Sequence, residues 1–394
     1  MDKKFFSITI LTPLFCIFFV INTLCIAQRS LKIQSINTLD RALRVKPIFN
    51  FNFETTRTEF KKTMLPLLEK NNIVFVDRNP DVILICGAPT KHMLTLKYPH
   101  IFLDEEESAS ISDLVRRSLR NPYTIAVFKN TTLRPKSLYN LPIKYHFKLI
   151  MDGFSASKKI KYSSLSQAEQ QKMRSVLWDI QRSPFKNILH PLTEQIIDFE
   201  TERPVDVFFA GTINENNPAG LHRALLMKKL RAMKQFEIIT HSGRLPKEEY
   251  LDLLRASKIA VSPWGNGEWA WRDYEAMYSG AVVIKPDTSF VLAVPDLYRN
   301  NKYYVACKPD FSDLEEKIAY VLENYEKFTD MRKNARNLLL DHWNYQKIAQ
   351  NLAHKLRQAF QNYNISKAMR KKSTISRPKG FLLKTALKKN LITS

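Results

Sequence analysis

The amino-acid sequence predicts an α/β protein with two parallel-sheet domains that face a cleft, preceded by an apolar N-terminal segment. Short apolar runs alternate with amphipathic helical segments along most of the 394 residues, and the alternation falls into two series. Each series has the length of an ordinary domain. Hydrophobic residues make up 44% of the chain and charged residues 25%. This composition is typical of folded globular proteins and excludes a chain that is disordered throughout.

The first 27 residues predict a membrane or export segment. Lys3 and Lys4 precede an uncharged stretch over residues 5–27, and roughly 20 apolar residues span a bilayer as a helix. Two alternatives stay open: an uncleaved signal anchor, which the length favours, and a signal peptide cleaved after Ala27. Both place the protein at a membrane or in the secretory pathway, which means the Golgi or ER lumen in a eukaryote and the inner membrane or periplasm in a bacterium. Residues 28–44 are expected to form a polar stem.

Positive charge is concentrated at the C-terminus. The formal net charge is +23, and no acidic residue follows Asp341. Such a segment usually forms a solvated arm that contacts anionic surfaces. We expect the basic tail, residues 364–394, to contact acidic lipid headgroups and not nucleic acid, because the apolar N-terminus indicates a membrane.

Residues 45–200 predict the first parallel-sheet domain, because short apolar strands that alternate with helices favour a parallel sheet covered on both faces. A polar helical stretch over residues 166–181 and the segment that follows it to Pro204 are expected to form the connection between the domains. The expected strands are residues 45–53, 73–76, 82–86, 101–103 and 124–128, and the expected helices are residues 56–70 and 111–119.

Residues 205–345 predict the second parallel-sheet domain by the same alternation. A separate C-terminal helix is expected over residues 346–363. The expected strands are residues 207–210, 236–240, 259–262 and 282–285, and the expected helices are residues 221–233, 247–256, 271–279, 313–324 and 331–342.

Glycines mark one edge of the second predicted sheet. Six of the nine glycines lie between residues 211 and 280. Gly211 follows a strand, and Gly265 and Gly267 lie between a strand and a helix. Glycine lets a ligand approach the backbone closely, and ligands of open parallel sheets bind at the carboxyl ends of the strands. Ordinary turn chemistry is the alternative, but several glycine turns at one edge favour a binding site.

Arg272 and Glu275 form the clearest candidate site. Both lie on the helix that follows the glycine loop, three residues apart and on the same face. A guanidinium at a helix N-terminus, beside exposed backbone N–H groups, is suited to a diphosphate. A carboxylate one turn later can accept two hydrogen bonds from a ribose diol. The alternative is a surface ion pair, which the glycine loop and the strand–loop–helix context disfavour.

Several segments of the second domain resemble the C-terminal half of exostosin-like and group-1 glycosyltransferases of the GT-B type, which has two Rossmann-like domains. Residues 303–305 and 310–314 resemble the related CAP10-like glucosyltransferases. The resemblance covers roughly residues 205–345. The residues that carry the first resemblance are 208–211, Arg223, Tyr250, 257–258, 262–265, 272–276, Gly280 and 282–284.

This resemblance implies that the second domain binds a nucleotide-sugar donor. Arg272 would contact the diphosphate and Glu275 the ribose or the sugar. Glu268 lies seven residues before Glu275, one short of the E-x7-E spacing of the group-1 enzymes. The residues expected to bind the donor are Gly211, Arg223, Gly265, Gly267, Glu268, Arg272, Glu275 and Lys285.

The sequence has no Asp-x-Asp pair of the kind that holds a divalent cation against a diphosphate. We therefore expect a metal-independent reaction, without a cofactor, in which the nucleotide sugar is a co-substrate. Arginine and lysine side chains and backbone N–H groups would stabilise the charge of the leaving diphosphate.

An inverting reaction needs a general base that deprotonates the acceptor hydroxyl. The candidates in the first domain are His92 and Asp104, together with His146 and Asp152. A retaining enzyme need not have such a base, and the sequence does not decide the stereochemistry.

The predicted function is glycosyl transfer, of a hexose or a pentose, from a nucleotide sugar to a hydroxyl of a glycan or protein acceptor. The expected membrane contacts are the N-terminal segment and the basic tail. Two alternatives stay open: a non-catalytic glycan-binding relative of the same fold, and a basic nucleic-acid-binding protein.

Overall fold

The structure is a computed structural model. It describes residues 41–50, 57–58, 60–87, 90–104, 109, 111–134, 165–177, 197–265, 267–342 and 344–375. The predicted N-terminal segment, most of the stem, residues 376–394, His146 and Asp152 lie outside these residues. Among the residues that are described, no helix is both long enough and apolar enough to cross a bilayer.

The chain divides into two compact units. One comprises residues 44–355 and contains both parallel sheets, and the other comprises residues 1–43 and 356–394. The helix α13, Tyr345–Ile375, contains the boundary between the units. It continues beyond residue 363, where the sequence predicts its end, so residues 364–375 of the predicted basic arm are helical.

The first sheet has the strand order β2-β1-β3-β4-β5-β7. Four neighbouring pairs, β1/β3, β3/β4, β4/β5 and β5/β7, are parallel. All six residues of the central strand β3 are buried, as expected for a strand covered on both faces. The strands are β1 (Leu43–Asn50), β2 (Ile73–Phe75), β3 (Val82–Gly87), β4 (His100–Asp104), β5 (Thr124–Lys129) and β7 (Met173–Ser175).

Short helices accompany this sheet: η1 (Phe60–Met64), α3 (Leu65–Glu69), η2 (Lys91–Thr95), α4 (Asp113–Leu119) and α6 (Gln167–Gln170). The prediction of one helix over residues 166–181 was wrong for its central part. Within the described residues 166–177 of this stretch, only α6 is helical, and β7 follows it and pairs with β5. Pairing with a buried strand outweighs the local helix preference of this polar stretch.

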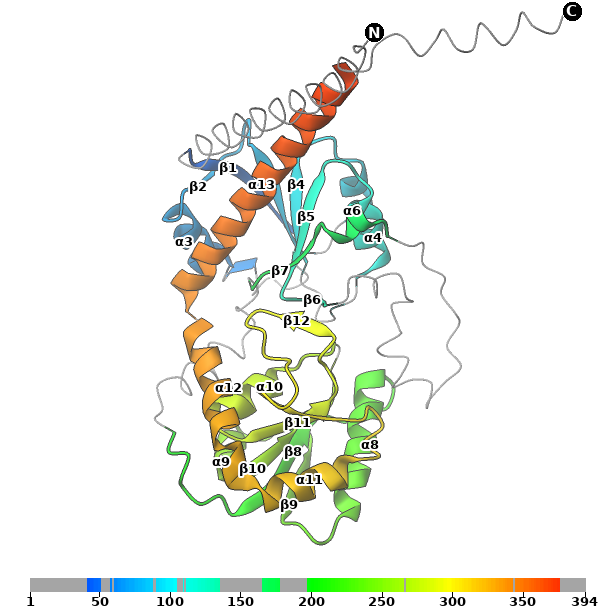
Figure 1. The fold of residues 1–394 in the computed structure, drawn as a ribbon, viewed down its shortest axis with the longest axis vertical. Coiled ribbons are helices and arrows are strands. Elements are labelled where there is room, and N and C mark those ends of the chain that lie inside the picture. The colour runs from blue at the N-terminus through cyan, green and yellow to red at the C-terminus, as the bar shows by residue number, and fades with distance from the viewer. Residues whose placement is uncertain are drawn as a thin grey trace, which may run out of the picture. The chain divides into compact units, whose positions relative to one another are not determined.

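The second sheet has the strand order β13-β11-β10-β8-β9, and all four neighbouring pairs are parallel. Helices lie against both of its faces (Figure 1). The strands are β8 (Val205–Gly211), β9 (Ile238–Ser242), β10 (Ser257–Val261), β11 (Val282–Pro286) and β13 (Val305–Cys307). The helices are α8 (Pro218–Ala232), α9 (Lys247–Ala256), α10 (Trp271–Tyr278), α11 (Leu314–Glu323), η5 (Tyr325–Phe328) and α12 (Thr329–His342).

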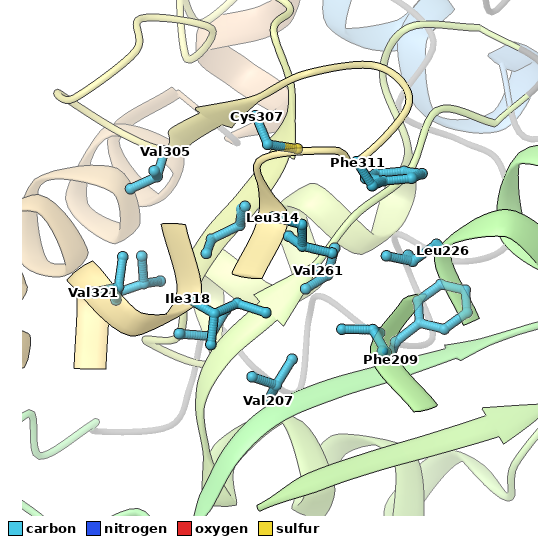
Figure 2. Close-up of a cluster of buried hydrophobic side chains, with 14 of the residues drawn as sticks. Val207, Phe209, Leu226, Val261, Val305, Cys307, Phe311, Leu314, Ile318 and Val321 are labelled. Carbon is cyan, nitrogen blue, oxygen red and sulfur yellow. The ribbon is translucent and has the colours of Figure 1, made fainter. Parts of the chain in front are cut away.

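Alternate residues of β8 pack on opposite faces of this sheet, because successive side chains of a strand point in opposite directions. Val207 and Phe209 pack with Leu226 of α8 and Ile318 of α11 in the core (Figure 2). Phe208 faces α9, where its ring lies 5.8 Å from that of Tyr250, centroid to centroid. Helices therefore pack against both faces of the sheet and hold in place the strands from which its loops begin.

A two-stranded antiparallel pair joins segments that are far apart in the sequence. β6 (Thr131–Leu133) follows the first sheet and pairs with β12 (Val291–Ala293), which follows β11. Beside this pair, Arg134 donates hydrogen bonds to both carboxylate oxygens of Asp296, at 2.6 and 3.1 Å.

Candidate functional site

Three loops that follow parallel strands meet at the carboxyl edge of the second sheet. Gly211 ends β8, and the N–H of Gly243, after β9, donates to the Gly211 carbonyl at 3.2 Å. The loop after β10 contains Gly265 and Gly267, and the Gly265 N–H donates to the Gly267 carbonyl at 3.0 Å. Helix α10 begins at Trp271, directly after this loop. The glycines of the sequence pattern thus lie where ligands of parallel sheets bind.

Two arginine side chains converge on Gly211. A Cβ atom added to Gly211 would lie 2.9 Å from Nη2 of Arg272 and 3.6 Å from Cδ of Arg223. A Cβ atom added to Gly265 would lie 3.8 Å from Nη2 of Arg223. Four of the eight residues predicted to bind the donor are therefore neighbours in space, although they come from β8, α8, the loop after β10 and α10.

Both guanidinium groups bind the backbone around the end of β8. Arg272 donates through Nη2 to the carbonyl of Ala210, and Arg223 donates through Nη1 to the carbonyl of Thr212 at 3.0 Å. The Arg272 guanidinium also lies over the ring of Phe209, 4.9 Å from its centroid. In the described part of the chain, the buried Nε of Arg272 has no hydrogen-bond partner. This arrangement presents the positive charge of two arginines at the sheet edge.

Glu275 lies one turn after Arg272 and is buried, with 6% of its surface exposed. Its Oε2 accepts a hydrogen bond of 2.6 Å from the hydroxyl of Tyr250 in α9. Burial raises the pKa of Glu275, while the Tyr250 hydroxyl and the charge of Arg272 act in the opposite direction. The alternative of a solvent-exposed surface pair does not describe this carboxylate.

Lys285 is fully buried in β11, and its ammonium group is already engaged. Nζ lies 2.6 Å from Oδ2 of Asp273 and donates to the Glu268 carbonyl at 2.9 Å. Sequence reasoning did not identify Asp273 as the partner of Lys285. A signal was present, because a lysine inside a strand expected to be buried on both faces requires a carboxylate partner.

Glu268 has a backbone partner from a distant part of the sequence. It is 2% exposed, and its Oε2 accepts a hydrogen bond of 2.8 Å from the N–H of Ala109. This contact ties the glycine loop to the segment that follows the first sheet's β4. A role of Glu268 in donor binding stays a prediction.

The two candidate bases have different surroundings. His92 is exposed in η2, where Nδ1 lies 3.0 Å from Oγ1 of Thr90. Asp104 is only 1% exposed and forms an ion pair of 2.6 Å with the fully buried Lys129. A carboxylate that compensates a buried ammonium already has a structural function, so exposure favours His92 as the group an acceptor can reach. The assignment of a base stays a prediction.

His222 lies in α8, next to Arg223, and packs near the carboxyl edge of the second sheet. Its ring stacks on Phe311 with the centroids 4.6 Å apart, and Nε2 lies 2.8 Å from the Pro309 carbonyl. Burial lowers the pKa of His222 to about 4. The imidazole is therefore neutral near pH 7, and it fixes α8 against the loop that follows β13.

Three buried arginines bind the carboxyl end of α10, opposite Arg272. Arg336 donates to the Tyr278 carbonyl, Arg203 to the Ser279 carbonyl at 2.8 Å, and Arg332 to the Gly280 carbonyl at 2.7 Å. The last carbonyls of a helix lack partners within the helix and carry partial negative charge. These contacts fix the end of α10.

Residues 221–354, about a third of the chain, match a family model described as Glycosyl transferase-like. This match covers Arg223, Arg272, Glu275 and Lys285, and it confirms the resemblance to glycosyltransferases predicted from the sequence. The two parallel α/β sheets are consistent with the GT-B type. No protein with curated function matches the chain in sequence.

Several solved structures are similar at low sequence identity. An α1,3-fucosyltransferase is 15% identical, with 82% of this chain and 90% of that chain covered, at a TM-score of 0.39. Anabaena HepE in complex with UDP-glucose is 13% identical, with coverages of 80% and 99% and a TM-score of 0.42. Sucrose-phosphate synthase from Thermosynechococcus elongatus is 11% identical, with coverages of 77% and 80% and a TM-score of 0.39.

Proposed function

We propose that this protein is a glycosyltransferase whose second sheet binds a nucleotide-sugar donor. The observation that carries the proposal is the convergence of Arg272 and Arg223 on Gly211 at the carboxyl edge of a parallel sheet. Two cations beside backbone N–H groups suit a diphosphate, which arginine binds through charge-assisted hydrogen bonds. The family match over residues 221–354 supports the same function.

In the proposed reaction, the bond between the anomeric carbon of the sugar and the diphosphate oxygen breaks, and the anomeric carbon bonds to an acceptor hydroxyl oxygen. Negative charge then develops on the nucleoside diphosphate, where Arg272 and Arg223 stabilise it. The acceptor proton passes to a base or to the leaving phosphate, depending on the stereochemistry. A hexose or pentose donor, a glycan or protein acceptor and a metal-independent reaction complete the proposal.

Glu275 is placed to recognise the donor one turn from Arg272. Tyr250 occupies Oε2, and carboxylate oxygens have several lone pairs, so Glu275 retains the capacity to accept hydrogen bonds from a ribose or sugar diol. The acceptor site is proposed for the first parallel-sheet domain, with His92 or Asp104 as base. The apolar N-terminal segment is proposed to attach the protein to a membrane, with the basic tail as a second contact.

A thermal-shift panel of nucleoside diphosphates and nucleotide sugars tests this function. A ligand at 100 times its dissociation constant stabilises a protein by about 2.7 kcal/mol, which is readily measured. At least one nucleotide sugar should raise the Tm, and the same sugar should be transferred or hydrolysed with release of the nucleoside diphosphate. Binding without turnover would favour the non-catalytic glycan-binding alternative.

The nucleic-acid-binding alternative makes a separate prediction. It requires binding that falls steeply with salt concentration and disappears when residues 364–394 are deleted.

Membrane attachment is tested by fractionation of the full-length protein. If the mature protein in the native host begins at Gln28, the N-terminal segment is a cleaved signal peptide and not an anchor.

A further inference from the structure

Asp273, next to Arg272 in the first turn of α10, accepts hydrogen bonds from four residues in three segments. Oδ1 accepts from the hydroxyl of Ser262, which follows β10. Oδ2 accepts from the Ala270 N–H at 3.1 Å, from Lys285 Nζ at 2.6 Å and from the Tyr298 hydroxyl at 2.8 Å. Asp273, Ser262, Lys285 and Tyr298 are all fully buried. One carboxylate thus joins α10 to β11, to both ends of the glycine loop and to the segment after β12.

The negative charge of Asp273 is compensated by a positive charge inside the protein. A buried carboxylate is strongly unfavourable unless an opposite charge and hydrogen bonds compensate it. Lys285 supplies that charge, and its ammonium also binds the Glu268 carbonyl and lies 4.4 Å from the centroid of the Tyr298 ring. The pair therefore fixes the backbone of the glycine loop as well as the helix.

Helix α10 has only eight residues, so the position of its first turn sets the positions of Arg272 and Glu275 together. Its carboxyl end is fixed by Arg203, Arg332 and Arg336. Because both ends of α10 are held, the contacts of Asp273 help to determine where the side chains of Arg272 and Glu275 begin.

We propose that Asp273 and Lys285 are positioning residues of the donor site, which hold Arg272 and Glu275 in place for the nucleoside diphosphate. Lys285 then acts through Asp273 and does not itself contact the diphosphate. This inference rests on the proposed function, because it assigns these residues to the same donor site. It adds a role for Asp273 and changes the role that the sequence predicts for Lys285.

The test must separate positioning from general stability. Asp273→Asn would leave the Lys285 ammonium uncompensated and can prevent folding. Tyr298→Phe is the better variant, because it removes one hydrogen bond to Oδ2 and keeps the ion pair. The ion pair of Lys258 with Asp206, at 2.8 Å, joins β10 to β8 in the same sheet without touching α10. Lys258→Met is therefore the matched control.

Binding of UDP and of GDP to the full-length protein is measured by calorimetry for a double-mutant cycle. Tyr298→Phe should weaken binding of the diphosphate that the wild type binds by about 3- to 10-fold, the scale of one hydrogen bond. In the Arg272→Ala background, titrated at millimolar ligand, the same change should have a clearly smaller effect on affinity, because only the part that acts through Glu275 remains. Lys258→Met should leave affinity within 2-fold in both backgrounds, even where it lowers the Tm.

Each outcome decides between the proposals. If Tyr298→Phe lowers the Tm but not the affinity, or if it weakens binding equally with and without Arg272, Asp273 has a structural role only and the inference fails. In both cases the wild type still binds a diphosphate, so the proposed function stands. If the wild type binds neither UDP nor GDP, nor any other nucleotide of the panel, the proposed function fails and this inference fails with it.

Discussion

The guanidinium of Arg272 lies so close to Gly211 that no side chain fits at position 211 without moving it. The added Cβ atom would be 2.9 Å from Nη2 of Arg272, a distance that real Cβ contacts essentially never show. Gly211 ends a strand, and Arg272 lies in the first turn of a helix, 61 positions later in the sequence. The need for glycine at position 211 therefore comes from the close approach of Arg272 and not from the backbone conformation, since Gly211 is not among the glycines with a positive φ.

This relationship predicts the effect of Gly211→Ala. The contacted atom is the far end of a flexible side chain, so Arg272 can move away at little cost in folding free energy. Diphosphate affinity should fall about 10-fold or more, because a charge-assisted contact is displaced, while the Tm of the ligand-free protein changes by only a few degrees. Calorimetric titration measures the affinity for the diphosphate, and thermal melts measure the Tm of the ligand-free protein. A large drop in Tm with unchanged affinity would show that the glycine serves the fold and not a ligand.

Glu275→Gln should separate donor recognition from stability in a different way. The amide oxygen can still accept the hydrogen bond from Tyr250, so the fold should be kept. Loss of the charge should weaken nucleotide-sugar binding about 10-fold, the scale for a hydrogen bond to a charged group. Tyr250→Phe is the comparison, because it leaves the buried carboxylate without its 2.6 Å partner. Tyr250→Phe should therefore lower the Tm more than Glu275→Gln does.

His222 predicts a loss of stability in mild acid. Its pKa is about 4 in the folded protein, against the ordinary value of 6.5. At pH values between 4 and 6.5 the unfolded chain binds more protons than the folded protein. The contribution of His222 to the free energy of unfolding is therefore complete above about pH 6.5 and decreases as the pH drops toward 4. The loss should be on the order of 3 kcal/mol.

Denaturant titrations of the wild type and of His222→Gln, at several pH values, measure this contribution. The variant cannot take up the proton, so the difference in unfolding free energy between the two proteins should shrink as the pH falls from 6.5 to 4. Other groups, such as His100, whose pKa burial also lowers, cancel in the comparison. A difference that does not change with pH would show that His222 does not titrate as its burial predicts.

Transfer should be insensitive to chelation. The sequence has no Asp-x-Asp pair, and within the described ranges no three His, Cys, Asp or Glu side chains gather to hold a metal ion. The proposed stabilisation of the diphosphate depends on Arg272 and Arg223. Activity should persist in excess EDTA. Complete loss that Mn²⁺ restores would contradict a donor site built on these arginines.

Much of the second sheet could be predicted from the sequence, because its strands are short, apolar and separated by amphipathic helices. The carboxyl edge could be located because glycines cluster after β8 and β10. Arg272 and Glu275 could be recognised from spacing within one helix. Each of these inferences uses residues that are close together in the sequence, where helix and strand periodicity determine which side chains share a face.

The remaining features depend on contacts between distant segments. Three of the four hydrogen bonds of Asp273 join residues 11 to 25 positions apart. The arginines at the end of α10 reach it from 52 to 76 positions away. Periodicity carries no information on such pairs. The strand β7 was missed for the same reason, since only its pairing with β5 makes it a strand.

Replacement of Arg272 tests the proposed donor site most directly. In Arg272→Ala the contact that strengthens as the leaving group gains charge is absent, so kcat should fall together with affinity for the donor. The expected loss is 10²- to 10³-fold in kcat, about 2.7–4 kcal/mol, by analogy with removal of one oxyanion donor. Arg272→Lys should recover only part of it, because an ammonium cannot offer the bidentate geometry of a guanidinium.

The measurement is a comparison of kcat and KM for the wild type, Arg272→Ala and Arg272→Lys with the nucleotide sugar that the binding panel identifies. A large loss of kcat in Arg272→Ala, a partial recovery in Arg272→Lys and an unchanged Tm are the results expected if Arg272 binds the diphosphate. Near-normal turnover in Arg272→Ala would contradict the donor site and, with it, the proposal of an active glycosyltransferase.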